Sequence, residues 1–376
     1  MIGSAVKTLA ARFDPAVSDP PLEARIRLVA GEEAHDAVVG SFGARIVESN
    51  GAKPDAVISG TPEAWRRAAD SPDGAVAALR RGGLRMRQNL HVAVGFLAGT
   101  AGEGLRLRTF ETSAGAISAA EAGVGPVVLA IHGLGGSKAS FLPTIGALAD
   151  AYRVIAIDLP GFGDSAKPVR AAYDAPYFAG VMSEVLDAAG ADSAYVVGNS
   201  MGGRIGIEMA LTMSARVERL VLLAPAMAWL RSRRWAPVVR LLRPELSLLP
   251  MPVEPVVRRM FPANGWAAAG MDEFLRAYKT PRGRQAFNAC ARNIYLDEPH
   301  GDTGFWTRLE RMSPEALFVW GRQDRLVPIG FMKHVERALP RARHVELDCG
   351  HVPQVEAPEP THRAIHQFFA GDGEDA

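Results

Sequence analysis

The chain has 376 residues, of which 48% are hydrophobic and 22% charged, and its formal net charge is +1 at pH 7. This length exceeds the size at which one hydrophobic core usually stops growing, so we expect one large domain and a smaller one. The balanced charge argues against a nucleic-acid-binding protein that depends on overall basicity.

The ends and cysteines of the chain bear on its compartment. Arg12, Asp14 and Pro15 interrupt the N-terminal segment before an apolar signal core could develop. No apolar run reaches the length of a membrane span. Cys290 and Cys349 lack metal-type spacing, so neither a disulfide framework nor a metal site is expected. We therefore predict a cytoplasmic protein whose contact with a membrane, if any, is peripheral.

The first hundred residues alternate strand-like and helical segments. Strands are predicted at 24–31, 43–49 and 55–61, and helical sequence follows from Pro62, a residue favoured at the first helical position. Residues 54–99 resemble the second half of a sterol carrier protein domain: a strand, a short helix after Thr-Pro, a second helix, a glycine and another strand. The resemblance implies a lipid held in an apolar tunnel. A small packed α+β accessory unit without ligand is the alternative for residues 1–103.

From residue 104 short β-branched runs alternate with amphipathic stretches, which is typical of a parallel sheet covered by helices on both faces. The near-continuous apolar character of these runs predicts buried central strands. The strands are expected at 126–133, 152–161, 194–200, 217–225, 316–321 and 343–351, and the crossover helices at 177–189, 201–213, 330–339 and 361–369.

An insertion rich in proline, tryptophan and arginine interrupts this alternation. Its part from 229 to 260 holds seven arginines against two glutamates. Basic groups on an apolar body suit an anionic membrane surface or an acidic substrate, and a lid helix with solvated or paired arginines has the same pattern. We predict a helical cap at 227–312, inserted into an α/β core at 104–226 and 313–376.

One serine stands between glycines directly after a predicted strand. Ser200 is the centre of Gly-x-Ser-x-Gly, in which the glycines permit a sharp turn from strand to helix that exposes the hydroxyl above the sheet. The following helix begins with free N–H groups that point toward the site. Serine is a weak nucleophile at its own pKa, so the pattern requires a base and a group that orients the base.

Positions along the chain select these partners. Of the nine histidines, only His351 follows the last predicted strand, at the carboxyl edge where open α/β sheets place their sites. Asp324 also lies just after a predicted strand and precedes the histidine. The order Ser200, Asp324, His351 is the chain order of the α/β-hydrolase triad.

The glycine-rich loop HGLGGS at 132–137 follows another predicted strand and supplies a second part of the site. Its glycines allow close approach of the backbone, so the N–H groups of Leu134 and Met201 are predicted to form an oxyanion hole. The substrate pocket is predicted to be lined by Gly133, Asn199, Trp229 and Val352. This chemistry requires neither a metal nor an organic cofactor, and none has a motif in the sequence.

From about residue 104 to 370 the chain resembles α/β-hydrolase fold enzymes in the blocks HGLGG, DLPGFGDS, GNSMGG, WGRQDRLVP and CGH. The resemblance implies a mostly parallel, doubly wound sheet with a helical lid. Two of these blocks, GNSMGG and WGRQDRLVP, are similar to the meta-cleavage product hydrolases, which split a carbon–carbon bond. That subgroup usually has tryptophan after the catalytic histidine, where this chain has Val352.

The preferred hypothesis is an esterase- or lipase-like serine hydrolase acting on an apolar ester or lipid. Two alternatives stay open: a carbon–carbon hydrolase of the meta-cleavage type, and a lipid-binding protein with a hydrolase scaffold. We predict no nucleic-acid partner, and the sequence does not indicate an oligomeric state.

Overall fold

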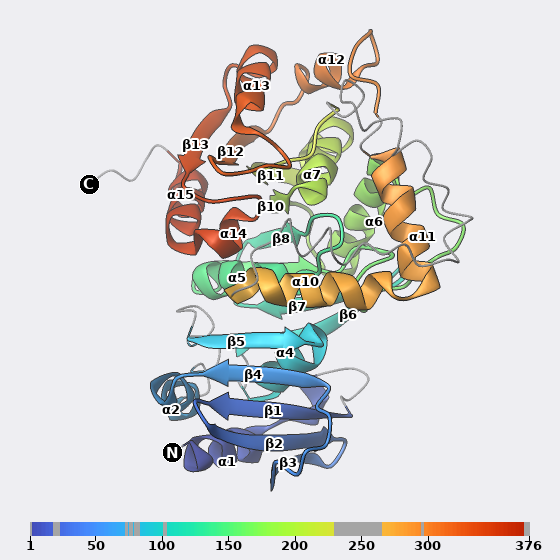
Figure 1. Cartoon of the computed structure of the whole chain (residues 1–376). Helices are drawn as coiled ribbons and strands as arrows, with labels where there is room; N and C mark the ends of the chain where they lie inside the picture. The colour runs from blue at the N-terminus through green and yellow to red at the C-terminus, as the bar shows by residue number, and fades with distance from the viewer. Residues whose placement is uncertain are drawn as a thin grey trace.

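The computed structural model describes residues 2–17, 23–71, 74, 78, 83–100, 104–228, 265–294 and 297–371. Two β-sheets, one of five strands and one of eight, follow each other along the chain (Figure 1). We call the part of the chain that contains the five-stranded sheet and its helices, up to residue 100, the N-terminal unit. Trp229 and the rest of the arginine-rich segment from 229 to 264 lie outside the described residues.

The N-terminal unit has strand order β3-β2-β1-β4-β5, in which β1 and β4 are parallel and the other neighbours are antiparallel. Buried side chains such as Ile26, Trp65 and Phe96 form its core. Its elements are α1 (Gly3–Arg12), a 3-10 turn (Pro15–Val17), β1 (Ala24–Ala30), β2 (Glu33–Gly40), β3 (Gly43–Glu48), β4 (Ala56–Gly60), α2 (Pro62–Asp70), β5 (Leu84–Gln88) and α4 (Leu90–Thr100).

Local sequence explains the beginning of α2. Thr61 precedes the helix in extended backbone, and its hydroxyl accepts a hydrogen bond from the Ala64 N–H at 3.2 Å. Pro62 is the first helical residue, as predicted, because its missing N–H would have no partner inside the helix.

Strand β2 was not predicted, because its polar residues hide the alternation of apolar and polar side chains. One of these polar residues, Asp36, is buried because Arg25 and Arg27 bind it. The resemblance to a sterol carrier domain stays a prediction.

The second sheet has the order β13-β12-β11-β10-β8-β9-β7-β6, with parallel pairing from β13 to β9. Strand β7 is antiparallel to both of its neighbours, β6 and β9. The sheet is therefore mostly parallel, as predicted. The strands are β6 (Arg106–Thr112), β7 (Gly115–Ala122), β8 (Val127–Ile131), β9 (Arg153–Ile157), β10 (Ala194–Asn199), β11 (Val217–Leu223), β12 (Glu315–Gly321) and β13 (Arg343–Leu347).

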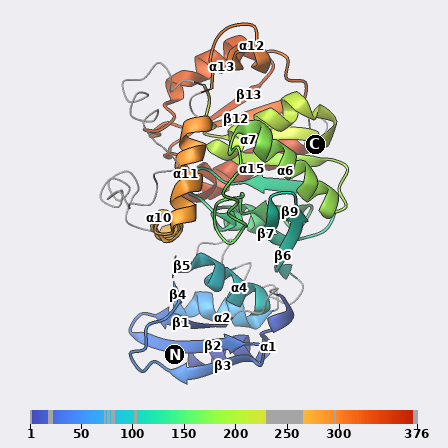
Figure 2. The same ribbon diagram turned by 90° about the vertical axis from the view of Figure 1, so that its right-hand side faces the viewer.

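Helices cover both faces of this sheet (Figures 1 and 2). The alternation of buried side chains shows why: Leu129 of β8 packs into the core beneath α6 and α7, whereas Val128 and Ala130 pack into the core on the other face. The helices are α5 (Leu142–Leu148), preceded by a 3-10 turn (Lys138–Phe141), α6 (Ala175–Ala188), α7 (Met201–Thr212), α13 (Met332–Ala338), α14 (Pro353–Glu356) and α15 (Pro358–Ala370), with short 3-10 turns at Ser214–Arg216 and Ile329–Phe331.

Two expectations for this sheet need correction. Strand β13 was predicted as a buried central strand, but it lies at the edge of the sheet and its side chains are half-buried or exposed. The antiparallel strands β6 and β7 were not predicted, because their short alternating pattern lacks the continuous apolar run of a central strand.

The region 227–312, predicted as a helical cap, contains three helices among its described residues: α10 (Gly265–Tyr278), α11 (Pro281–Asn293) and α12 (Phe305–Leu309). Helix α10 lies against β5 of the N-terminal unit (Figures 1 and 2). It contacts β5, α14 and the 3-10 turn Lys138–Phe141. Within the described part of the chain, no helix is long and apolar enough to cross a membrane.

Candidate active site

Ser200 occupies a strained turn between β10 and α7. Its φ is +52°, in the left-handed region that residues other than glycine rarely adopt. The glycines on either side are required by contact: a Cβ on Gly202 would lie 2.0 Å from the Ile131 carbonyl oxygen, and a Cβ on Gly198 would lie 2.4 Å from that of Gly202. The N–H of Ser200 donates to the Leu223 carbonyl at 2.9 Å. The turn therefore packs against strands β8 and β11 at the carboxyl edge of the sheet.

His351 and Asp324 follow β13 and β12, and their side chains meet. His351 Nδ1 lies 2.8 Å from Asp324 Oδ2. The other carboxylate oxygen, Oδ1, accepts the backbone N–H groups of Leu326 and Val327 at 2.7 and 2.9 Å. Because the Asp324 side chain is fully buried and both of its oxygens are hydrogen-bonded, its orientation toward the imidazole is set. His351 Nε2 is then left for a proton from another group.

Asn199 and Glu356 hold the backbone around His351. The Asn199 side-chain nitrogen donates to the carbonyls of His351 and Leu223, each at 3.0 Å. The Glu356 carboxylate accepts the N–H groups on either side of the histidine, from Gly350 at 2.8 Å and from Val352 at 2.9 Å. Asn199 directly precedes Ser200, so its amide connects the serine turn to the histidine loop.

The loop after β8 approaches the same turn. A Cβ on Gly133 would lie 3.1 Å from the Ser200 Cβ, which places this loop directly against the serine. Among the described residues, neither the Leu134 nor the Met201 N–H donates to a protein acceptor. Met201 begins α7, where the first N–H groups have no partner within the helix. These two N–H groups stay the predicted oxyanion donors.

His132 fixes the beginning of this loop. Its Nε2 accepts the Leu159 N–H at 2.9 Å, so the proton is on Nδ1, which donates to the Gly133 carbonyl at 2.7 Å. The side chain is fully buried, and this burial lowers the pKa of His132 below its ordinary value, although the Asp158 charge opposes the effect. The neutral ring therefore ties the glycine-rich loop to the loop that follows β9.

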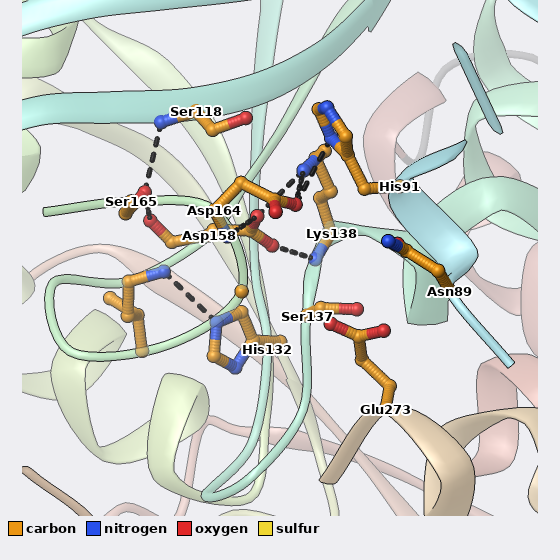
Figure 3. A network of polar contacts seen from close by, with 12 residues as sticks. Asn89, His91, Ser118, His132, Ser137, Lys138, Asp158, Asp164, Ser165 and Glu273 are labelled. Carbon is orange, nitrogen blue, oxygen red and sulfur yellow. Dashed lines mark hydrogen bonds and ion pairs between the residues drawn. The ribbon is translucent and has the colours of Figure 1, made fainter. Parts of the chain in front are cut away.

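Lys138, at the end of the glycine-rich loop, is a buried cation with two carboxylate partners (Figure 3). Its Nζ lies 2.6 Å from Asp158 Oδ2 and 3.1 Å from Asp164 Oδ2. Asp158 Oδ1 also accepts the Lys138 N–H at 2.7 Å. Burial acts to lower the pKa of Lys138, but the two carboxylates outweigh it and the net direction is upward. Lys138 thus remains charged and holds the loop that follows β9 against the glycine-rich loop.

Stability should decrease below about pH 6.5 because of buried neutral histidines. Burial lowers the pKa of both His132 and His344, so each binds its proton in the unfolded chain at a higher pH than in the folded one. Each histidine therefore lowers the free energy of unfolding by up to about 1.4 kcal/mol for every unit by which the pH falls. Urea denaturation between about pH 7.5 and 5 measures the slope. His132→Asn should make the slope shallower by one proton, and an unchanged slope would contradict the assignment.

The two cysteines do not offer an alternative nucleophile. Both are buried free thiols. Burial, followed by the nearby charges of Glu356 and Asp324, raises the pKa of Cys349 to about 12, and burial raises that of Cys290 well above its ordinary value. A protonated thiol is a poor nucleophile. In the part of the chain that the structure describes, no group of three or more His, Cys, Asp or Glu side chains is placed to hold a metal ion.

Several predicted residues lie together, and others were missed. The structure brings together Gly133, Asn199, Ser200, Asp324 and His351 at one edge of the sheet, while Trp229 lies outside the described residues. Val352 directly follows the histidine, is half-buried, and donates its N–H to Glu356. Glu356 was missed, although an acidic residue in the first turn after Pro353 is a recognisable helix-start pattern.

Comparisons with known proteins identify the family and the fold that this chain resembles. A family model described as alpha/beta hydrolase fold matches residues 126–247. The dihydrolipoyllysine-residue acetyltransferase component of the acetoin cleaving system of Cupriavidus necator is 30% identical over 281 residues, which cover 72% of this chain and 68% of that protein. A 2-hydroxy-6-oxononadienedioate/2-hydroxy-6-oxononatrienedioate hydrolase of Paraburkholderia phymatum is 30% identical over 256 residues, covering 64% of this chain and 85% of that one. Among solved structures, a membrane phospholipase A aligns with a TM-score of 0.60 and 26% identity over 80% of this chain and 92% of that chain.

Proposed function

Because the chain belongs to the alpha/beta hydrolase fold family, we propose that it is a serine hydrolase that cleaves carboxylic esters with apolar acyl or alcohol groups. One observation carries the proposal: His351, 2.8 Å from the buried Asp324, is tied through its carbonyl to the residue preceding the strained Ser200. A strained serine, an oriented imidazole and a buried carboxylate are the three parts that acyl transfer requires.

The proposed reaction proceeds through an acyl-enzyme. The Ser200 oxygen attacks the ester carbonyl carbon while His351 Nε2 takes the hydroxyl proton, and Asp324 stabilises the imidazolium. The Leu134 and Met201 N–H groups bind the oxygen that becomes negative. The tetrahedral intermediate collapses, and the alcohol leaves with the proton from His351. Water then attacks the acyl group by the same route, which releases the acid and returns the proton to Ser200.

Aromatic side chains beside the glycine-rich loop support an apolar substrate. Phe274 of α10 contacts this loop so closely that a Cβ on Gly135 would lie 2.3 Å from its ring. Phe274, Tyr278 and Phe287 pack together with ring centroids 5.3 to 5.5 Å apart. This aromatic cluster adjoins the predicted oxyanion donors, where an acyl or alcohol chain would lie. The similarity to a membrane phospholipase A makes lipid esters the first substrate class to test.

Carbon–carbon hydrolysis is the second candidate, and the identity to a 2-hydroxy-6-oxononadienedioate hydrolase favours it. Such a substrate needs a donor for its acid group in addition to the triad. An asparagine or arginine side chain could supply this donor, but the Asn199 amide nitrogen already donates to two carbonyls. Arg204 is buried against Glu208 and Asp297, at 2.8 and 2.5 Å. Because both side chains are already engaged in these contacts, the ester stays the first candidate.

The proposal includes a membrane or lipid partner for two parts of the chain, the arginine-rich segment and the N-terminal unit. The arginine-rich segment 229–260 is proposed to contact an anionic membrane surface, with a peripheral location of the enzyme. The N-terminal unit is proposed as an accessory unit, and a lipid-binding protein with an inactive hydrolase scaffold is the third candidate. That candidate requires that the triad has no role in the cell.

The test is a panel of p-nitrophenyl esters from acetate to palmitate, run beside a chromophoric 2-hydroxy-6-oxo-dienoate. We expect turnover of the esters, with an optimum at a medium or long acyl chain because of the aromatic cluster. Turnover of the dienoate alone would replace the ester by the carbon–carbon proposal. If neither substrate reacts, the proposal of a non-catalytic scaffold gains support.

A further inference from the structure

Residues 87–91, which comprise the end of β5 and the beginning of α4 and are called the turn at residues 87–91, contact helix α10 with three donors. The Arg87 Nε and Nη2 lie 2.8 and 3.3 Å from the Asp272 carboxylate oxygens. The N–H of Gln88 donates to the same carboxylate at 3.2 Å. Gln88 has a φ of +70°, a strained conformation for a residue other than glycine. The backbone is thus held in an unfavourable conformation at the point where it binds α10.

The same turn contacts the buried charge network behind the glycine-rich loop (Figure 3). His91 Nδ1 lies 3.0 Å from Asp164 Oδ2, the oxygen that also binds Lys138 Nζ. Arg276 of α10 lies 3.5 Å from the other oxygen of Asp164. Burial acts to raise the pKa of Asp164, but the contact with His91 and the charge of Lys138 outweigh it, so this pKa is well below its usual range.

Both contacts lie within a few residues of the glycine-rich loop 132–137, which carries the predicted oxyanion donor Leu134 and is called the oxyanion loop below. Asp272 is two positions before Phe274, whose ring covers Gly135, and Gly135 has a φ of +76°. Lys138 is three positions after Gly135 and begins the 3-10 turn that follows the loop. Helix α4 also packs against the 3-10 turn Lys138–Phe141, and the buried core of the N-terminal unit continues into this region through Ala139 and Phe141.

We propose that the turn at residues 87–91 positions the oxyanion loop, so that the N-terminal unit is a working part of the hydrolase site. The inference rests on the proposed function, because it assigns the loop to transition-state binding. Arg87 and Gln88 bind α10 on one side of the loop, and His91 lies against Asp164 of the Lys138 network on the other. The residues act through the loop and contact no substrate.

The test uses a charge exchange. Arg87→Asp and Asp272→Arg, made singly, should each lower kcat for ester hydrolysis by about two- to thirtyfold with KM changed less, because a displaced oxyanion donor weakens transition-state binding. The double variant, with the charges exchanged, should recover most of kcat. The pair is partly exposed, so thermal stability should change little in all three variants. Arg85→Asp, an exposed position on the same strand, is the matched control with unchanged kcat.

Amide hydrogen exchange separates this proposal from the proposed function. In the single variants, exchange at residues 133–141 should be faster than in the wild type, and the double variant should reverse this change. If exchange and kcat are both unaltered in the single variants, or the double variant does not recover, the positioning role is wrong. If the wild type cleaves no ester, the proposed function fails, and the exchange result alone decides whether the turn at residues 87–91 positions the loop.

Discussion

Ser200→Ala is expected to lower kcat for ester hydrolysis by about four to six orders of magnitude, because alanine cannot form the acyl-enzyme. The residual rate would come from substrate binding and the oxyanion donors alone. Purified wild type and variant are compared on the p-nitrophenyl ester with the highest wild-type turnover, with an active-site titration by a covalent serine reagent. The reagent should label the wild type once per chain and leave the variant unlabelled.

The controls for this variant separate chemistry from folding. Ser183→Ala on α6 removes a serine hydroxyl away from the site and should keep full activity. Ser200→Ala should unfold at nearly the wild-type temperature, because alanine retains the Cβ in the same left-handed turn. A variant that keeps more than about a tenth of the wild-type kcat would contradict serine catalysis, since loss of a triad nucleophile costs far more than tenfold.

Ser200→Gly makes the strain in the turn measurable. Glycine adopts a positive φ without steric cost, so this variant should be inactive and more stable than Ser200→Ala by about 1 kcal/mol. Urea denaturation of the two variants gives the difference. Equal stability would mean that the turn stores no strain at φ +52°.

Lys138→Met is expected to lower the free energy of unfolding by about 3–5 kcal/mol, because it leaves the buried carboxylate of Asp158 without its cation. Lys138 is 2% exposed and Asp158 is fully buried, so water cannot replace the lost partner. Activity should fall as well, since the lysine begins the turn that follows the predicted oxyanion loop. Urea denaturation at pH 7 measures the change in stability.

Arg322→Met is the matched control for the buried lysine. Arg322 also binds two carboxylates, Glu346 and Asp348, each at 3.1 Å, but its side chain is 51% exposed. Its removal should therefore cost far less stability than the removal of Lys138, because water and salt screen an exposed ion pair. Adding Asp158→Asn to Lys138→Met should recover part of the loss, because it removes the uncompensated charge. Equal losses for Lys138→Met and Arg322→Met would show that burial does not strengthen the first pair.

The order of the strands explains why the candidate triad could be predicted from sequence positions. Ser200, Asp324 and His351 each follow a strand of one parallel stretch of sheet, and the carboxyl ends of parallel strands meet at one edge. Their separation along the chain is then irrelevant to their proximity. The edge position of β13 could not be predicted in this way, because the apolar pattern of a strand does not state which neighbours it has.

The contacts that support the candidate triad could not be predicted from the sequence pattern of strands and strand ends. Asn199 was predicted only as a residue of the substrate pocket, yet its amide binds the carbonyl of His351. The ion pair of Lys138 with Asp158 and the contact of Arg87 with Asp272 join residues that are 20 and 185 positions apart. Each of these depends on where a distant segment packs, which a local pattern does not contain.

The sequence by itself determined the parallel sheet, the serine turn and the three residues at the strand ends, because glycine conformation, apolar periodicity and strand-end position act within a few residues. Only the tertiary structure decided how that edge is held. The Glu356 carboxylate on the histidine loop, the buried Lys138 network and the N-terminal turn at residues 87–91 all bind partners that the fold, and not the neighbouring sequence, places within hydrogen-bonding distance. Burial makes those polar contacts strong, and burial is a property of the packed molecule.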